Sequence, residues 1–298
     1  MRILKYFVSL LILTITITNA YAFDPTAKSI TVVIPFAPGG GVDQTFRHFE
    51  KYATKKGLNF TPLYRPGAEG LIGMNEIAGM PKDGYHISFG TVGTIATQRI
   101  KNPTAELDTV TAVRNSISAY ITHKNSGINS IQDLYKGTVT VGFGAPGQRM
   151  LLEKFIELSK KKPDFVWVPY KGGAPLVQDI AGGHVQFGAP PLLISKAMID
   201  SGKIKLIAVG SSQRLQEYPD VPTVNSILPG WQDVDAFTFI LPKNTDPAAE
   251  KFWSQFLKEY MSDRSVQADF IREFNELNEF GRKPVEQLIK NAIVALSN

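Results

Sequence analysis

The chain has 298 residues, of which 43% are hydrophobic and 20% charged, and it contains no cysteine. The hydrophobic fraction is too high for a disordered chain. The absence of cysteine excludes a disulfide scaffold, a thiolate zinc site and a cysteine nucleophile. The net charge of +5 is a modest excess that does not indicate nucleic acid as a partner, and we expect none.

The first 22 residues have the layout of a secretory signal peptide. Basic residues precede an apolar run over residues 6–18, and Ala-Tyr-Ala at 20–22 forms a cleavage signal. The apolar run is too short to favour a membrane span, although an uncleaved anchor is the alternative. Cleavage after Ala22 would place Phe23, rather than a lipid-modifiable cysteine, at the new N-terminus. We therefore expect a soluble protein of the periplasm.

After this segment the chain begins with alternating strands and helices. Predicted strands at 29–36, 59–64 and 86–90 alternate with predicted helices at 43–56 and 71–78. The first strand is β-branched and apolar without alternation, which is typical of a strand buried on both faces of a parallel sheet. The succession of strand, glycine-rich turn and helix predicts an α/β fold.

The middle of the chain repeats this pattern, and the C-terminal part is helical. Predicted strands at 138–143, 164–168, 185–187, 204–209 and 237–241 accompany predicted helices at 149–160 and 176–181. After Pro242, Asp246 is a predicted N-cap with Pro247 at the first helical position. We expect two α/β lobes, with residues 23–122 and 237–298 in lobe 1 and residues 123–236 in lobe 2.

Catalytic and cofactor signatures are absent from the sequence or weak. There is no G-x-S-x-G, H-E-x-x-H or Walker A motif, and the four histidines lie far apart. Residues 142–147 match the dinucleotide pattern G-x-G-x-x-G. An exported protein rarely meets such cofactors, however, and Pro146 removes an N–H donor from the turn. We expect no cofactor, no metal and no enzymatic activity.

Glycine-rich turns instead follow the predicted strands at 37–41, 66–70, 144–147 and 171–175, and each precedes a helix. The first N–H groups of a helix are unpaired and carry partial positive charge. Glycine lets a ligand approach the backbone closely. Turns of this kind that converge at the ends of parallel strands form an anion site. The alternative is that they are ordinary connections that need tight geometry.

These turns resemble those of the extracytoplasmic solute receptors of the tripartite tricarboxylate transporter family, the Bug receptors. The matching stretches are PFAPGGG at 35–41, RPGAEGLIG at 65–73, KDGY at 82–85, VPYKGGAP at 168–175, GG at 182–183 and YPDVPT at 218–223. They occur in order behind the expected signal peptide.

The resemblance implies a type II periplasmic-binding-protein (Venus flytrap) fold, with a mixed, mostly parallel sheet flanked by helices in each of two lobes. It also implies a small carboxylate ligand that is delivered to the membrane subunits of a tripartite transporter. Two other functions stay open: presentation of the liganded form to a signalling sensor, and an exported enzyme on the same fold. We expect a monomer.

By the same resemblance, the ligand-binding residues come from turns of both lobes. The candidates are Phe36, Ala37, Pro38, Gly39, Gly40, Gly41, Val42, Asp43, Gly67, Ala68, Glu69, Gly70, Thr91, Gly144, Ala145, Gly147, Tyr170, Lys171, Gly172 and Gly173. Asp43 either caps the first helix, with a tie to Arg47, or binds a ligand amine or hydroxyl, and capping is favoured. Phe36 and Tyr170 are either pocket walls or core, and Lys171 is a rim charge that steers anions.

The sequence departs from the family pattern at positions that bear on the ligand. Val42 and Ala145 replace hydroxyl residues, and Gln186 stands where an aspartate often follows the glycine pair. Glu69 replaces a glycine, and its carboxylate faces outward, pairs with a ligand amine or repels a second carboxylate, the first being favoured. Fewer hydroxyl groups favour a monocarboxylate with an apolar or aromatic body over a citrate-like ligand.

Overall fold

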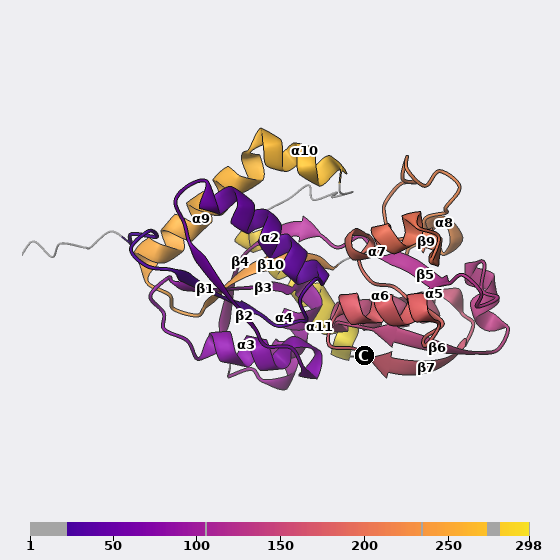
Figure 1. Ribbon diagram of the computed structural model, residues 1–298. Helices are drawn as coiled ribbons and strands as arrows, with labels where there is room; N and C mark the ends of the chain where they lie inside the picture. Colours follow the sequence, from indigo (N-terminus) through magenta and orange to yellow (C-terminus); the bar gives the residue numbers. More distant parts are fainter. Residues whose placement is uncertain (1–22, 105, 234, 273–280, 298) are drawn as a thin grey trace, which may run out of the picture.

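The computed structural model describes residues 23–104, 106–233, 235–272 and 281–297. The expected signal peptide lies outside these ranges. Two separate sheets divide the described chain into two lobes that lie side by side (Figure 1). Within the described part, no helix combines the length and the apolar character that crossing a membrane requires.

The sheet of the first lobe has five strands. Their order is β2 (Phe60–Tyr64), β1 (Ile30–Ile34), β3 (His86–Thr91), β10 (Ala236–Pro242) and β4 (Leu107–Asn115). β1 pairs in parallel with β2 and β3, whereas β10 runs antiparallel to β3 and β4. Its helices are α2 (Gly41–Thr54), α3 (Leu71–Ala78), α4 (Val92–Lys101), α9 (Pro247–Ser262), α10 (Arg264–Arg272) and α11 (Arg282–Ser297).

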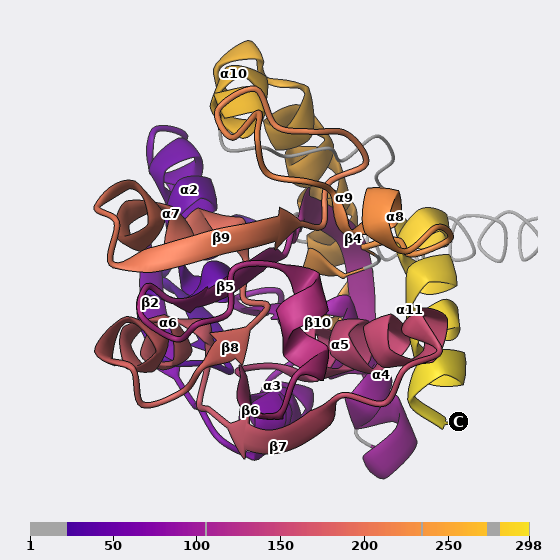
Figure 2. The ribbon, with the colours of Figure 1, turned by 90° about the vertical axis from the view of Figure 1, so that its right-hand side faces the viewer.

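The second sheet repeats this arrangement. Its strands are β7 (Asp164–Pro169), β6 (Thr138–Phe143), β8 (Phe187–Gly188), β5 (Ala119–His123) and β9 (Ile204–Val209), seen in this order from bottom to top in Figure 2. β6 is parallel to β7 and β8, and β5 is antiparallel to β8 and β9. Its helices are α5 (Pro146–Ser159), α6 (Gly173–Gly182), α7 (Leu192–Asp200) and α8 (Val224–Ile227). The prediction of a two-lobed α/β fold with mixed sheets is confirmed.

Two chain crossings join the lobes. The first connects β4 to β5 between Asn115 and Ala119, and the second leads from α8 back to β10 at Ala236. Sequence patterns do not predict the strands β4 and β5 or the helices α4 and α7.

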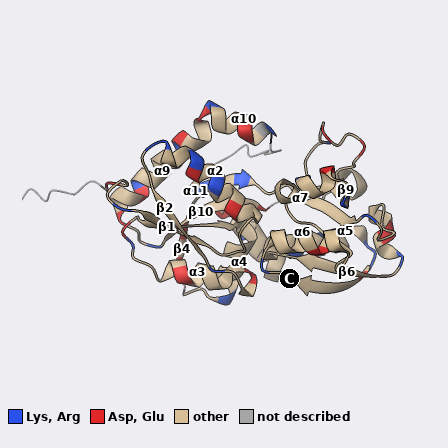
Figure 3. Ribbon diagram, in the orientation of Figure 1, with Lys and Arg blue, Asp and Glu red and all other residues tan. Residues whose placement is uncertain are grey.

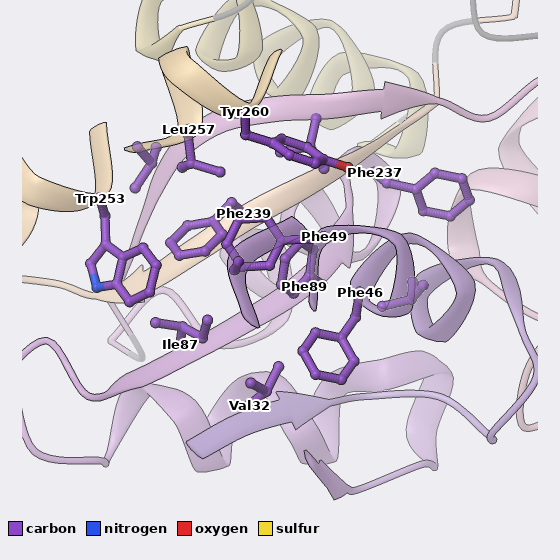
Figure 4. Packing of buried hydrophobic residues seen from close by; sticks show 14 of the residues in the cluster. Val32, Phe46, Phe49, Ile87, Phe89, Phe237, Phe239, Trp253, Leu257 and Tyr260 are labelled. Atoms are coloured by element: carbon purple, nitrogen blue, oxygen red, sulfur yellow. The ribbon is translucent and has the colours of Figure 1, made fainter. Parts of the chain in front are cut away.

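Aromatic side chains dominate the core of the first lobe (Figure 4). The Phe49 ring lies 5.4 Å from that of Phe89 and 5.9 Å from that of Phe239, measured between ring centroids. The indole of the buried Trp253 donates a hydrogen bond of 2.8 Å to the carbonyl of Gly84. Replacing such a fully buried phenylalanine by alanine typically costs about 3–5 kcal/mol, so this core holds β1, β3 and β10 firmly behind the site.

Charged side chains of both signs occur on both lobes (Figure 3). The second lobe has its own core around Tyr120, Phe155, Phe187 and Trp231. Each lobe therefore has a core of its own, although Ala145 and Met150 at the start of α5 also pack into cores of the first lobe. The two crossings are the covalent links about which the lobes can move relative to each other.

Candidate ligand-binding site

Four helices begin at one small cavity between the lobes. Two belong to the first lobe, α2 and α4, and two belong to the second, α5 and α6. The cavity measures about 20 Å³, which is room for about one water molecule. We call it the cleft cavity, and it is lined by Phe36, Gly40, Gly41, Val42, Thr91, Ser116, Gly144, Ala145, Gln148, Gly173, Pro191, Asp235 and Phe237.

The two lobes touch each other around this cavity. The backbone N–H of Ala37, after β1, donates a hydrogen bond of 3.0 Å to the carbonyl of Lys171, after β7. A β carbon added to Gly172 would lie 3.3 Å from the nitrogen of Ala37. The first and last glycine-rich turns therefore meet directly, and the structure shows the lobes in a closed arrangement.

Asp43 supports the turn that begins α2. One carboxylate oxygen accepts a hydrogen bond of 2.8 Å from the N–H of Gly39, and the other accepts one of 2.8 Å from the Tyr64 hydroxyl. The Arg47 guanidinium lies 3.5 Å away. The N-cap position itself is Gly40, so Asp43 closes the turn from the third helical position. It does not line the cleft cavity.

The turn at residues 67–70 lies behind the cavity wall. A β carbon on Gly70 would lie 3.0 Å from the Phe36 ring, and it is the Phe36 ring that lines the cavity. Ala68 and Glu69 have φ values of +46° and +57°, in the left-handed region that favours glycine. Glu69 is half-buried and lines neither cavity described in this section.

The remaining candidates surround the cavity without lining it. Pro38 and Gly39 are exposed, as is Lys171. The Tyr170 hydroxyl donates a hydrogen bond of 2.8 Å to Asp179, and burial together with this carboxylate raises the tyrosine pKa above its ordinary value. Gly147 lies at the start of α5, where it faces Gly93 and Asp235.

Five residues that sequence patterns did not identify also line the cleft cavity. They are Ser116, Gln148, Pro191, Asp235 and Phe237. Gln148 is buried, and its Oε1 accepts a hydrogen bond of 2.8 Å from the N–H of Gly144. Its Nε2 is therefore the end of the amide that can donate to a ligand. Ser116 and Asp235 come from the two crossings, which no local motif marks.

Asp235 places a carboxylate between the starts of two helices. Its Oδ1 accepts a hydrogen bond of 3.1 Å from the N–H of Gly93 in α4, and the Thr91 hydroxyl also bonds to its carboxylate. A β carbon on Gly147 of α5 would lie 2.3 Å from Oδ2. Burial raises the Asp235 pKa to about 6, and the hydrogen bonds from Gly93 and Thr91 oppose this increase.

A larger cavity of about 260 Å³ adjoins the first at the crossings. We call it the hinge cavity, and it is lined by Asn115, Ser116, Ile117, Gly210, Ser211, Ser212, Asn225, Trp231, Gln232, Asp233 and Asp235. Ser116 and Asp235 line both cavities. None of the described residues that line the hinge cavity is basic.

Asp233 is the second acid of the hinge cavity. Its Oδ2 accepts hydrogen bonds of 2.7 Å and 2.8 Å from the backbone N–H and the hydroxyl of Ser118. Burial raises its pKa to about 7, the Ser118 hydrogen bonds oppose this increase, and the nearby Asp235 adds to it. Among the described residues, no group of three or more His, Asp or Glu side chains is arranged to hold a metal ion.

Similarity to known proteins identifies the family of this chain. The model of the tripartite tricarboxylate transporter family receptor matches residues 62–281. The chain belongs to this family. Its members are solute receptors rather than enzymes. The family receptor BugT of Bordetella pertussis is 27% identical to this chain over 258 residues, which cover 80% of this chain and 78% of BugT.

Solved structures of similar fold include other periplasmic binding proteins. A protein of R. palustris determined with adipate has a TM-score of 0.83 at 23% identity and covers 92% of this chain and 96% of its own. The periplasmic binding protein BugD has a TM-score of 0.79 at 23% identity, with 90% and 96% covered. MatC from Rhodopseudomonas palustris with bound malate has a TM-score of 0.77 at 20% identity, with 91% and 99% covered. These likenesses confirm the periplasmic-binding-protein fold of this family receptor.

Proposed function

We propose that this family receptor binds a small carboxylate in the cleft cavity and delivers it to the membrane subunits of a tripartite tricarboxylate-type transporter. The convergence of helix N-termini from both lobes on one cavity supports this proposal: α2 comes from the first lobe and α5 and α6 from the second, while the start of α4 already pairs with Asp235. Unpaired N–H groups and the positive ends of helix dipoles favour an anion there without any basic side chain.

The distribution of contacts explains how binding and closure are coupled. Gly41 and Val42 at the start of α2 face Gly173 at the start of α6 across the cavity. A carboxylate that accepts hydrogen bonds from both sides makes all its contacts only when the lobes are together. Such a ligand shifts the population of receptors toward the closed state. Charge-assisted hydrogen bonds of this kind contribute about 1.5–3 kcal/mol each.

The walls of the cleft cavity favour a ligand with one carboxylate and an apolar body. Phe36, Val42, Ala145 and Phe237 present carbon to the cavity, and neither Val42 nor Ala145 has the hydroxyl that would bind an additional ligand oxygen. The adipate-bound and malate-bound proteins of similar fold support a carboxylate as the ligand class. We further propose a soluble periplasmic protein that binds its ligand without chemical change.

Calorimetric titration with a panel of mono-, di- and tricarboxylates tests the proposal. At least one carboxylate is expected to bind below millimolar concentration and to reduce the radius of gyration in solution scattering. Native mass spectrometry of the freshly purified protein should show the same ligand, and prolonged incubation should return it unchanged. A receptor that binds no carboxylate at millimolar concentration contradicts the proposal.

A variant of the cavity makes the test specific. Gly41→Val places a side chain in a space where even a β carbon would lie 2.6 Å from the Phe237 ring. We expect it to abolish carboxylate binding while the protein stays folded. Gly137→Ala is the matched control, because a β carbon there meets nothing within 4 Å, and its affinity should equal that of the wild type.

A further inference from the structure

The carboxylate of Asp235 occupies the kind of position that a ligand carboxylate would take. It accepts the N–H of Gly93 near the start of α4 and lies against Gly147 near the start of α5. Only 6% of this residue is exposed. The positive end of α4 is therefore already paired with an anion that belongs to the protein.

Asp235 also lies where the two cavities meet. It lines the cleft cavity, which has room for about one water molecule, and the hinge cavity, which measures about 260 Å³. A ligand that places its carboxylate among the glycine-rich turns therefore finds space for the rest of its atoms past Ser116 and Asp235. The group at its far end must suit the hinge cavity.

Two carboxylates line the hinge cavity together with hydroxyl and amide side chains, and none of its described lining residues is basic. Asp233 and Asp235 supply carboxylates, and Gln232 supplies an amide group, whereas the Oδ1 of Asn225 already accepts a hydrogen bond of 3.0 Å from the N–H of Gly230. A second ligand carboxylate here would face two acids with no cation to balance it, which is an unfavourable arrangement in a buried site. The charge of an ammonium group would instead be balanced by the two carboxylates.

We propose that Asp235 restricts this receptor to ligands that have a single carboxylate and a hydrogen-bond donor, above all an ammonium group, at the other end. The carboxylate binds at the starts of α2, α5 and α6, and the donor enters the hinge cavity past Asp235. This inference rests on the proposed function and specifies the ligand class of the same site.

Two matched ligand series test this inference by calorimetry at pH 8. The shorter series is 4-aminobutanoate, pentanoate and glutarate, which differ only in an ammonium, methyl or carboxylate end group. The longer series is 6-aminohexanoate, heptanoate and heptanedioate. In the series that binds more tightly, the amino acid should bind at least ten-fold more tightly than the dicarboxylate, with the fatty acid between them.

Variants assign the preference to Asp235. In Asp235→Asn the ratio of the two affinities should fall at least five-fold, because the amino acid loses affinity and the dicarboxylate gains it. Asp235→Ser provides the same comparison should the asparagine variant fold poorly. Glu153→Gln removes an acid from the outer face of α5, where Glu153 pairs with Arg149 at 2.8 Å, and should leave the ratio unchanged.

The outcomes separate this inference from the proposed function. A wild-type receptor that binds a dicarboxylate as tightly as its amino analogue overturns the inference and leaves the proposed function intact. A ratio that does not change in Asp235→Asn overturns it equally. If all six ligands and the wider carboxylate panel fail to bind, the proposed function itself is contradicted.

Discussion

Gly93 of α4 and Gly147 of α5 face each other across the interface between the lobes with no room for a side chain. A β carbon on Gly93 would lie 2.5 Å from the backbone nitrogen and 2.6 Å from the α carbon of Gly147. Both neighbours are backbone atoms, which cannot rotate away as the end of a side chain can. The closed arrangement of the lobes therefore depends on glycine at this contact.

Gly93→Ala should hold the lobes apart. The atoms nearest to the added methyl group belong to Pro146 and Gly147 of the other lobe. The variant should therefore keep the stability of the wild type to within about 1 kcal/mol. It should lose at least ten-fold in carboxylate affinity, since the contacts from the two lobes can no longer form together. Calorimetry and solution scattering check this, with Gly137→Ala as the control. A variant that closes on its ligand like the wild type would refute the role of this contact.

The buried carboxyl group of Asp235 predicts a particular dependence of stability on pH. Its pKa is about 6 in the folded protein and ordinary in the unfolded chain. The folded state therefore binds the proton more tightly. The contribution of this group to stability is fully present below pH 4 and is lost as the pH rises through 6.

Urea unfolding of the wild type and of Asp235→Asn at pH 4 and pH 7.5 measures this effect. The free energy of unfolding of the wild type should fall between these pH values by about 2–3 kcal/mol more than that of the variant. The other titrating groups contribute to both proteins, and most of their effect cancels in the difference. Equal pH dependence in the two proteins would show that Asp235 titrates at its ordinary pKa.

Local sequence patterns predicted much of the fold because the strands of both lobes are apolar and end at glycine-rich turns. The strands at 138–143 and 204–209 and the helix at 71–78 have the predicted bounds. The helix α4 was missed because it begins Val-Gly-Thr and contains β-branched residues that lower helix propensity. It is held instead by packing against α11, α5 and α3.

The same limit applies to the candidate site. Turns of the glycine motifs could be predicted to converge because the carboxyl ends of parallel strands share one edge of a sheet. Ser116 and Asp235 are separated by the whole second lobe, and they meet only because the chain crosses twice at the hinge. No spacing in the sequence indicates that meeting. Motif analysis therefore could not identify Asp235, whose carboxylate we propose selects the end group of the ligand.

Trp231 should report ligand entry into the hinge cavity. It lines this cavity and is only 1% exposed, whereas Trp253 lies in the core of the first lobe and Trp167 lies on the edge strand β7. The ligand-induced change in tryptophan fluorescence should disappear in Trp231→Phe and persist in Trp167→Phe, with the affinity measured by calorimetry in both. A full fluorescence change in Trp231→Phe would place the ligand outside the hinge cavity.

Glu69→Gly should stabilise the protein without changing its ligand preference. Glu69 has φ +57° and ψ +30°, a conformation that costs a residue with a β carbon about 1–2 kcal/mol. The greater entropy of glycine in the unfolded chain offsets about 0.5–1 kcal/mol of this cost. We expect a net gain of about 0.5–1 kcal/mol in the free energy of urea unfolding.

Glu69→Gln keeps the β carbon and removes the charge, so it should match the wild type in stability. Because Glu69 lines neither cavity, both variants should retain the wild-type ratio of affinities for 4-aminobutanoate and glutarate, and a changed ratio in both would show that the Glu69 carboxylate acts on the ligand.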